Sequence, residues 1–279
     1  MMYKNLLKKR LFTVIVSMFF MLIFISLTLS IYFINDLKPF IKLLSVNSNS
    51  NEQQLVEPPN NNIYNLPESN MLVDVPLILQ YPELPRGCEV TSLAMLLEYS
   101  GNPVDKLTLA SEIEKDNSYY KTAYGRVFYG NPDHGFVGDM YSLSDQGFGV
   151  YHKPIFNLLS KYLPEEAIDL TGRKFEDTLY FLSKDIPVWV ITNTKFNELS
   201  PDDFHVWYTS TVPIQITYYE HSVLLTGYDK DYIYFNDPLV NKINQKVPIE
   251  DFKKSWDQMG KQSVSYIPAD KQEFFEFIY

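Results

Sequence analysis

The sequence predicts an α+β domain that follows a single membrane-spanning helix. Three observations lead to this prediction: an uncharged apolar run lies near the amino terminus, helical periodicity is concentrated in the first half of the remaining chain, and strand-like segments are concentrated in the second half. Helices followed by strands favour an α+β class over an alternating α/β fold. Apolar residues make up 46% and charged residues 21% of the 279 positions, which is typical of a globular protein.

The apolar run covers residues 11–34 and contains no charged residue. A helix of about 20 apolar residues spans the bilayer core. Lys8, Lys9 and Arg10 come directly before the run, and basic residues stay on the cytoplasmic side of a membrane. We therefore expect residues 1–35 to form a cytoplasmic basic end and a single-pass anchor, with the rest of the chain outside the cytoplasm. A cleaved signal peptide is the less favoured alternative, because its apolar region usually has about 7–15 residues.

A linker and an acidic body follow the predicted anchor. Residues 36–70 are rich in Asn and Pro towards their end, so we expect a flexible linker there. We expect the domain itself to cover residues 71–268 and a C-terminal tail to cover 269–279. Residues 46–279 contain 18 basic and 33 acidic residues, and this negative charge argues against nucleic acid as a partner.

The elements of the domain follow from apolar spacing and from capping residues. Apolar residues recur at helical spacing over residues 89–99, Gly101 is a stop signal, and Asp105 is a helix cap. A proline within residues 73–79 predicts an edge strand there. Residues 115–152 show no clear period, which in a compact domain usually marks a functional segment. The remaining predicted helices are 105–113, 154–163, 174–184 and 249–258, and the remaining predicted strands are 186–192, 204–209, 214–218, 221–227, 232–236 and 263–267.

The only cysteine of the chain, Cys88, stands where the first predicted helix begins. Because the chain has only this cysteine, it can form neither an internal disulfide nor a thiolate zinc cluster. Backbone N–H groups and the helix dipole at a helix amino terminus favour a thiolate, and Arg86 adds a positive charge nearby. The pattern therefore predicts a thiol with a lowered pKa that acts as a nucleophile. A buried structural cysteine is the alternative.

A thiol nucleophile needs a base, and the base needs an orienting group. His221 begins a predicted hairpin, HSVLLTGYDKDYIYFNDPL, whose turn we place at Asp229. That register sets His221 opposite Asp237 on one face of the sheet and turns Asn236 to the other face. The sequence thus predicts a His221–Asp237 pair. A core histidine beside a turn aspartate is the alternative, and a slip of one residue would exchange Asn236 for Asp237.

Other polar residues give weaker signals. Gln80 could join the Cys88 N–H in stabilising an oxyanion, since it precedes the cysteine by a short segment. His205 is an alternative base, although its alternation with Trp207 favours a packed strand residue. A further group, Asp133, His134 and Asp139, could bind a metal but follows no ligand spacing.

Three stretches together resemble the papain-like cysteine peptidases, and more closely the family related to the double-glycine leader peptidases, the thirty-ninth cysteine family. The stretches are VPLILQYPELPRGCEVTSLAMLLEYSG, YGNPDHGFVGDM and EHSVLLTGYDKDYIYFNDPL. The resemblance implies a papain-like fold over about residues 71–268, with Cys88 as nucleophile, His221 as base, Asp237 as orienting acid and Gln80 as oxyanion donor. The leader peptidases usually have Cys-Gly where this chain has Cys88-Glu89.

We therefore expect a membrane-anchored, extracytoplasmic cysteine peptidase that acts on a peptide or protein substrate without a cofactor. Two alternatives use the same fold. One is a catalytically silent module that binds peptides or cell wall, and a buried, unreactive thiol on Cys88 would favour it. The other is a cell-wall amidase or acyl transferase; related wall hydrolases often have a histidine at the position of Asp237, which weighs against it.

Overall fold

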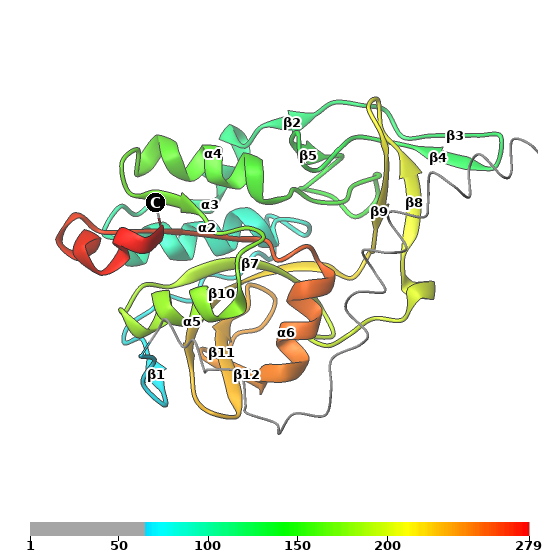
Figure 1. Ribbon diagram of the computed structural model, residues 1–279. Coiled ribbons are helices and arrows are strands. Elements are labelled where there is room, and N and C mark those ends of the chain that lie inside the picture. Colours follow the sequence, from blue (N-terminus) through cyan, green and yellow to red (C-terminus); the bar gives the residue numbers. More distant parts are fainter. Residues whose placement is uncertain (1–64, 279) are drawn as a thin grey trace, which may run out of the picture. The chain divides into compact units, whose positions relative to one another are not determined.

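A computed structural model describes residues 65–278, and its central element is a seven-stranded sheet (Figure 1). The strand order is β12-β11-β10-β7-β13-β6, with β1 paired to β10, and these neighbouring strands are all antiparallel. The strands are β1 (Asn70–Met71), β6 (Ala167–Asp169), β7 (Val188–Asn193), β10 (Glu220–Tyr228), β11 (Tyr232–Asn236), β12 (Gln245–Pro248) and β13 (Ser263–Tyr266).

Helices cover both faces of this sheet, as alternation along β7 shows. The Trp189 indole donates to the Glu89 carbonyl in α2 (Cys88–Tyr99) at 2.9 Å, whereas Thr192 Oγ1 bonds Ser255 Oγ in α6 (Ile249–Gln258) at 2.7 Å. Trp189 and Thr192 are three positions apart and so point to opposite faces. The helices α3 (Lys106–Glu112) and α4 (His152–Tyr162) pack beside α2, and α5 (Phe175–Ser183) packs beside α6 (Figure 1).

A smaller sheet lies at one side of the central sheet (Figure 1). Its four strands are β3 (Lys121–Ala123), β4 (Arg126–Phe128), β8 (His205–Tyr208) and β9 (Pro213–Ile216). The predicted irregular region 115–152 therefore contains two short strands of this sheet, together with the parallel pair β2 (Lys115–Asp116) and β5 (Phe136–Val137). A separate apolar cluster, which includes Tyr129, Phe148 and Trp207, packs beneath it.

The predicted helices are confirmed to within two residues at each end. Asp105 caps α3 by accepting the Leu107 N–H at 2.8 Å, and Gly101 follows α2 with φ of +82°. Positive φ is the backbone conformation that glycine adopts without strain, so this residue ends the helix as expected. Two short 3₁₀ helices were not predicted, η1 (Pro201–Asp203) and η2 (Ala269–Ile278).

The strand predictions were less accurate. The strand predicted at residues 73–79 is wrong, because this segment begins with a bend at Val73 and Asp74 and pairs with no strand among the described residues, and only β1 before it joins the sheet. Pro76 has no N–H to donate, and the Asn236 side chain occupies the carbonyls of Val75 and Pro76. Neither β6 nor β12 was predicted. The class α+β is confirmed, since helices and an antiparallel sheet form separate layers.

The predicted membrane anchor at residues 11–34 lies outside the described residues. Within residues 65–278, no helix has both the length and the apolar character that crossing a bilayer requires.

Candidate active site

Three of the four predicted site residues line one cavity of about 240 Å³: Gln80, Cys88 and His221. Cys88 is the first residue of α2, as predicted, and His221 is the second residue of β10. Gln80 lies in the extended segment before α2. The first residue of α2 and the second residue of β10 thus place a thiol and an imidazole at the same cavity.

The fourth residue, Asp237, directly follows β11 and holds the imidazole. Its Oδ1 lies 2.8 Å from His221 Nε2, and both side chains are buried. Burial opposes ionisation of Asp237, but the hydrogen bond and charge of His221 outweigh it and lower the pKa of the carboxyl. Asp237 Oδ1 also accepts the Leu239 N–H at 2.8 Å, so the residue holds the turn as well. The predicted pair is confirmed, and the imidazole keeps Nδ1 for other partners.

The register from which this pair was predicted is wrong by two residues. The structure sets Leu225 opposite Phe235 and Leu224 opposite Asn236, and a bulge interrupts the ladder before Gly227. A shift by two residues keeps every side chain on its face, whereas a shift by one would reverse it. His221 and Asp237 are therefore diagonal neighbours that still share a face.

The turn itself explains the error in register. Asp229 Oδ1 accepts the N–H groups of both Asp231 and Tyr232, and the Asp229 N–H donates to the Tyr232 carbonyl. The turn therefore spans residues 229–232 and is centred after Asp229. Asn236 points to the opposite face, as predicted, where its side chain accepts the Asn244 N–H.

The predicted electrostatics of Cys88 are wrong. The residue is 8% exposed, and its Sγ donates to Glu89 Oε2 at 3.3 Å. Burial raises the pKa of the thiol well above its ordinary value, and the carboxyls of Glu89 and Glu220 raise it further. Arg86 offers no compensation, because its guanidinium donates to backbone carbonyls, among them that of Asp145 at 2.9 Å.

A family model for the Peptidase C39-like family matches residues 72–264. The chain belongs to this family. The uncharacterised protein YvpB of Bacillus subtilis (strain 168) is 44% identical over 183 residues, which make up 66% of this chain and 70% of YvpB. The crystal structure of a candidate C39-like peptidase from Bacillus anthracis is 47% identical and has a TM-score of 0.68, covering 72% of this chain and 98% of that one. The resemblance seen in the sequence is confirmed.

Two acidic residues beside the thiol were missed as site residues. Ligand atoms of Cys88, Glu89 and Glu220 all lie within 4.8 Å of one another. Glu89 is fully buried, and burial raises its pKa to about 7. Burial and the neighbouring Glu89 raise the pKa of Glu220 well above its ordinary value. The signal was present in the sequence, since Glu89 follows the cysteine of this C39-like chain and Glu220 precedes its histidine.

Gly149 makes room for both of these carboxyls. A Cβ at this position would collide with Glu89 Oε1 and would lie 2.8 Å from Glu220 Oε2. Glu89 Oε1 accepts the Val150 N–H at 2.7 Å, which fixes one carboxyl against the glycine segment. The carboxyls of Glu89 and Glu220 therefore both lie against the backbone of Gly149.

Gln80 is placed on the cavity wall, but its amide nitrogen is already engaged. Nε2 donates to the carbonyls of Leu84 (3.2 Å) and Pro85 (2.9 Å). Its Oε1 is buried without a hydrogen-bond partner. An amide has two hydrogens to donate. The role of Gln80 as oxyanion donor therefore requires the amide to reorient, and it stays a prediction.

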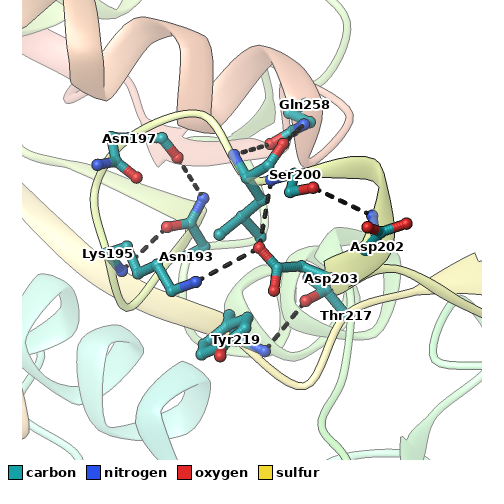
Figure 2. Close-up of polar contacts among 10 residues, drawn as sticks. Asn193, Lys195, Asn197, Ser200, Asp202, Asp203, Thr217, Tyr219 and Gln258 are labelled. Atoms are coloured by element: carbon teal, nitrogen blue, oxygen red, sulfur yellow. Dashed lines mark hydrogen bonds and ion pairs between the residues drawn. The ribbon is translucent and has the colours of Figure 1, made fainter.

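The loop after β7 forms another wall of the cavity, and Figure 2 shows the hydrogen bonds that fix it. Asn193 Nδ2 donates to the Asn197 carbonyl at 2.8 Å, and Asn193 Oδ1 accepts the Lys195 N–H at 3.0 Å. Lys195 Nζ in turn reaches Asp203 Oδ2 at 3.4 Å (Figure 2). Thr194 stands between Asn193 and Lys195 in the chain and lines the cavity.

The other candidates from the sequence do not join the site. His205 is exposed on β8, with its ring 5.6 Å from that of Tyr218. Asp139 uses Oδ1 to accept the N–H groups of Tyr141 and Ser142. Among residues 65–278, the one close grouping of potential metal ligands is Cys88 with Glu89 and Glu220, and Asp133, His134 and Asp139 do not form such a grouping.

Proposed function

We propose that this C39-like protein is a membrane-anchored, extracytoplasmic cysteine peptidase that hydrolyses peptide amide bonds by a Cys-His-Asp mechanism. The observation that carries the proposal is the cavity that both Cys88 and His221 line, with the His221 imidazole held by Asp237 at 2.8 Å. Family membership supports peptidase chemistry in general terms. The anchor is proposed from the uncharged run at residues 11–34 and its basic flank.

In this mechanism His221 acts in turn as a base and as an acid. His221 accepts the proton of the Cys88 thiol, and the sulfur attacks the substrate carbonyl carbon. The imidazolium, stabilised by Asp237, then protonates the departing amine, which leaves an acyl group on the sulfur. Water loses a proton to His221 and its oxygen attacks the acyl carbon, the C–S bond breaks to release the acid, and His221 returns the proton to the sulfur, which restores the thiol. The Cys88 N–H at the start of α2 stabilises the oxyanion, with Gln80 as a second donor once its amide has turned.

The experiment that tests the proposal replaces the nucleophile. Cys88→Ala should abolish cleavage of a mixed peptide library by the full-length chain while its circular dichroism stays unchanged, because thiol to methyl is a small change at a buried position. Cys88→Ser controls for the polarity of the group. Cleavage by Cys88→Ala at the rate of the unchanged chain would refute the thiol mechanism.

A second candidate function is a catalytically silent peptide-binding module on the same fold. The observation that favours it is the buried thiol, whose pKa is raised by burial and by two carboxyls. Such a module would bind peptides with equal affinity before and after Cys88→Ala and would release no product. The same library separates the two functions, because binding without cleavage identifies the module.

A further inference from the structure

Glu220 places an unpaired acidic group at the candidate active site. Its Oε1 is buried and has no hydrogen-bond partner, and the residue itself is only partly buried and lines the cavity with Cys88 and His221. None of the ion pairs found among residues 65–278 involves Glu89 or Glu220. A buried polar atom without a partner costs free energy, so a donor that reaches Glu220 Oε1 would be stabilising.

The surroundings of Glu220 favour an organic cation. Phe148 and Tyr218 line the same cavity with ring centroids 6.4 Å apart, and Tyr218 is 61% exposed. Aromatic faces attract ammonium and guanidinium groups and also pack against the alkyl stems that carry them. The one guanidinium that lines the cavity, on Arg86, is held by backbone carbonyls instead.

We infer that Glu220 makes this site selective for peptides that carry a lysine or arginine side chain next to the bond that is cleaved. This inference rests on the proposed peptidase function and adds the substrate class. The last torsion of a glutamate is broad, so the carboxylate can turn an oxygen towards an arriving ammonium group. Residues 46–279 carry 33 acidic against 18 basic residues, so the body as a whole also attracts cationic peptides.

A cationic side chain at Glu220 would also favour the chemistry at the thiol. When they are ionised, Glu89 and Glu220 oppose thiolate formation on Cys88. A positive charge placed against Glu220 favours the ionised form of this carboxyl, whose pKa is raised, and offsets part of the repulsion. None of the ion pairs found among residues 65–278 brings a cation to Glu220, so a cationic side chain of the substrate is favoured in binding and in the formation of the nucleophile.

The test compares lysine with norleucine, which has the same alkyl stem without the ammonium group. A mixed peptide library is first cleaved by the full-length chain in detergent with EDTA present, and mass spectrometry locates the cut. Matched peptides then carry lysine or norleucine beside that bond. We expect kcat/KM to favour lysine by about tenfold to a hundredfold, as for a hydrogen bond to a charged group. In Glu220→Gln this ratio should fall to near one.

A matched control separates recognition from thiol reactivity. Glu89→Gln changes the same acidic cluster, but Glu89 is fully buried and does not line the cavity. Because the two peptides of a pair meet the same free enzyme, a change in the basal reactivity of its thiol cancels in the ratio, and Glu89→Gln should keep the lysine preference. Equal cleavage of the two peptides, or a preference that survives Glu220→Gln, would overturn the inference and leave the peptidase proposal intact.

A binding measurement keeps the inference testable if no peptide is cleaved, an outcome that would overturn the peptidase proposal itself. Calorimetry with the Cys88→Ala chain should show tighter binding of the lysine peptide than of its norleucine partner, and Glu220→Gln should remove the difference. Equal affinities would overturn the inference. So would tight binding of Zn²⁺ that depends on Glu220 without any lysine preference, since the acidic cluster would then be a metal site.

Discussion

Asp237 and Asn236 are adjacent in the chain but should have separable effects on activity and stability. Asp237 holds His221 at 2.8 Å, whereas Asn236 donates to the carbonyls of Val75 and Pro76 and accepts the Asn244 N–H. Asp237 therefore orients the imidazole, whereas the hydrogen bonds of Asn236 connect three backbone segments. Replacing each in turn tests whether this assignment of faces is right.

The magnitudes follow from the contacts that each change removes. Asp237→Ala removes a buried carboxylate from the imidazole, and we expect kcat/KM to fall at least a hundredfold, about 3 kcal/mol of transition-state stabilisation. Asn236→Ala removes three hydrogen bonds of about 1 kcal/mol each, so the free energy of unfolding should fall by about 3 kcal/mol. Turnover by folded Asn236→Ala should fall by roughly tenfold or less.

Asp237→Asn serves as the control for the turn. It keeps an oxygen that can accept from both His221 and the Leu239 N–H, and it removes only the charge. Its loss of turnover should lie between those of the two alanine variants, about tenfold, with little loss of stability. This comparison separates the effect of the carboxylate on the imidazole from its effect on the turn.

Peptide cleavage under initial-rate conditions gives kcat/KM, and urea unfolding of the full-length chain gives the stability. Trp189, Trp207 and Trp256 are each at most 2% exposed, so tryptophan fluorescence reports the loss of the core. If Asn236→Ala lost turnover steeply while Asp237→Ala kept it, the third member of the proposed triad would be misassigned.

Two further predictions concern the thiol and the topology. Above about pH 7 an ionised Glu89 opposes the Cys88 thiolate from 3.3 Å, so alkylation by iodoacetamide should require a higher pH than the alkylation of a free thiol does. Glu89→Gln should shift the pH profile of alkylation to lower pH. An unchanged profile would show that the two groups do not interact. Protease added to intact protoplasts should digest residues 36–279, because the basic flank places the amino terminus inside, and full protection would reverse the orientation.

The helices and the His221–Asp237 pair could be predicted from the sequence because local signals determine them. The bounds of α6 agree with the prediction at both ends, since its apolar spacing and its ends are all encoded within ten residues. The face shared by His221 and Asp237 was also predicted correctly, because alternation along a strand tolerates a shift by two. Where the signal is periodic, an error in register of one full period leaves the inference about the shared face unchanged.

Short strands could not be predicted in this way. Each of β6 and β12 has only three or four residues. The strand β12 pairs with the preceding strand β11, and the partner that defines β6 is β13, which is distant in the chain. The same holds for the missing strand at residues 73–79, where a side chain from residue 236 occupies the carbonyls that a neighbouring strand would need. Pairing across such distances is set by the tertiary structure rather than by local propensity.

The electrostatics of the thiol show the strongest limit of sequence reasoning. A helix amino terminus acts as roughly half a positive charge, and this effect together with the charge of Arg86 predicted a lowered pKa for Cys88. Glu89 is covalently adjacent, and Glu220 directly precedes His221, yet only the fold brings both carboxyls within 4.8 Å of the sulfur. Burial of the thiol and the two carboxyls raise its pKa and outweigh half a charge, because the low dielectric of the interior strengthens the repulsion. The direction of the pKa shift is therefore set by what the tertiary structure places around the sulfur, and the helix start by itself does not determine it.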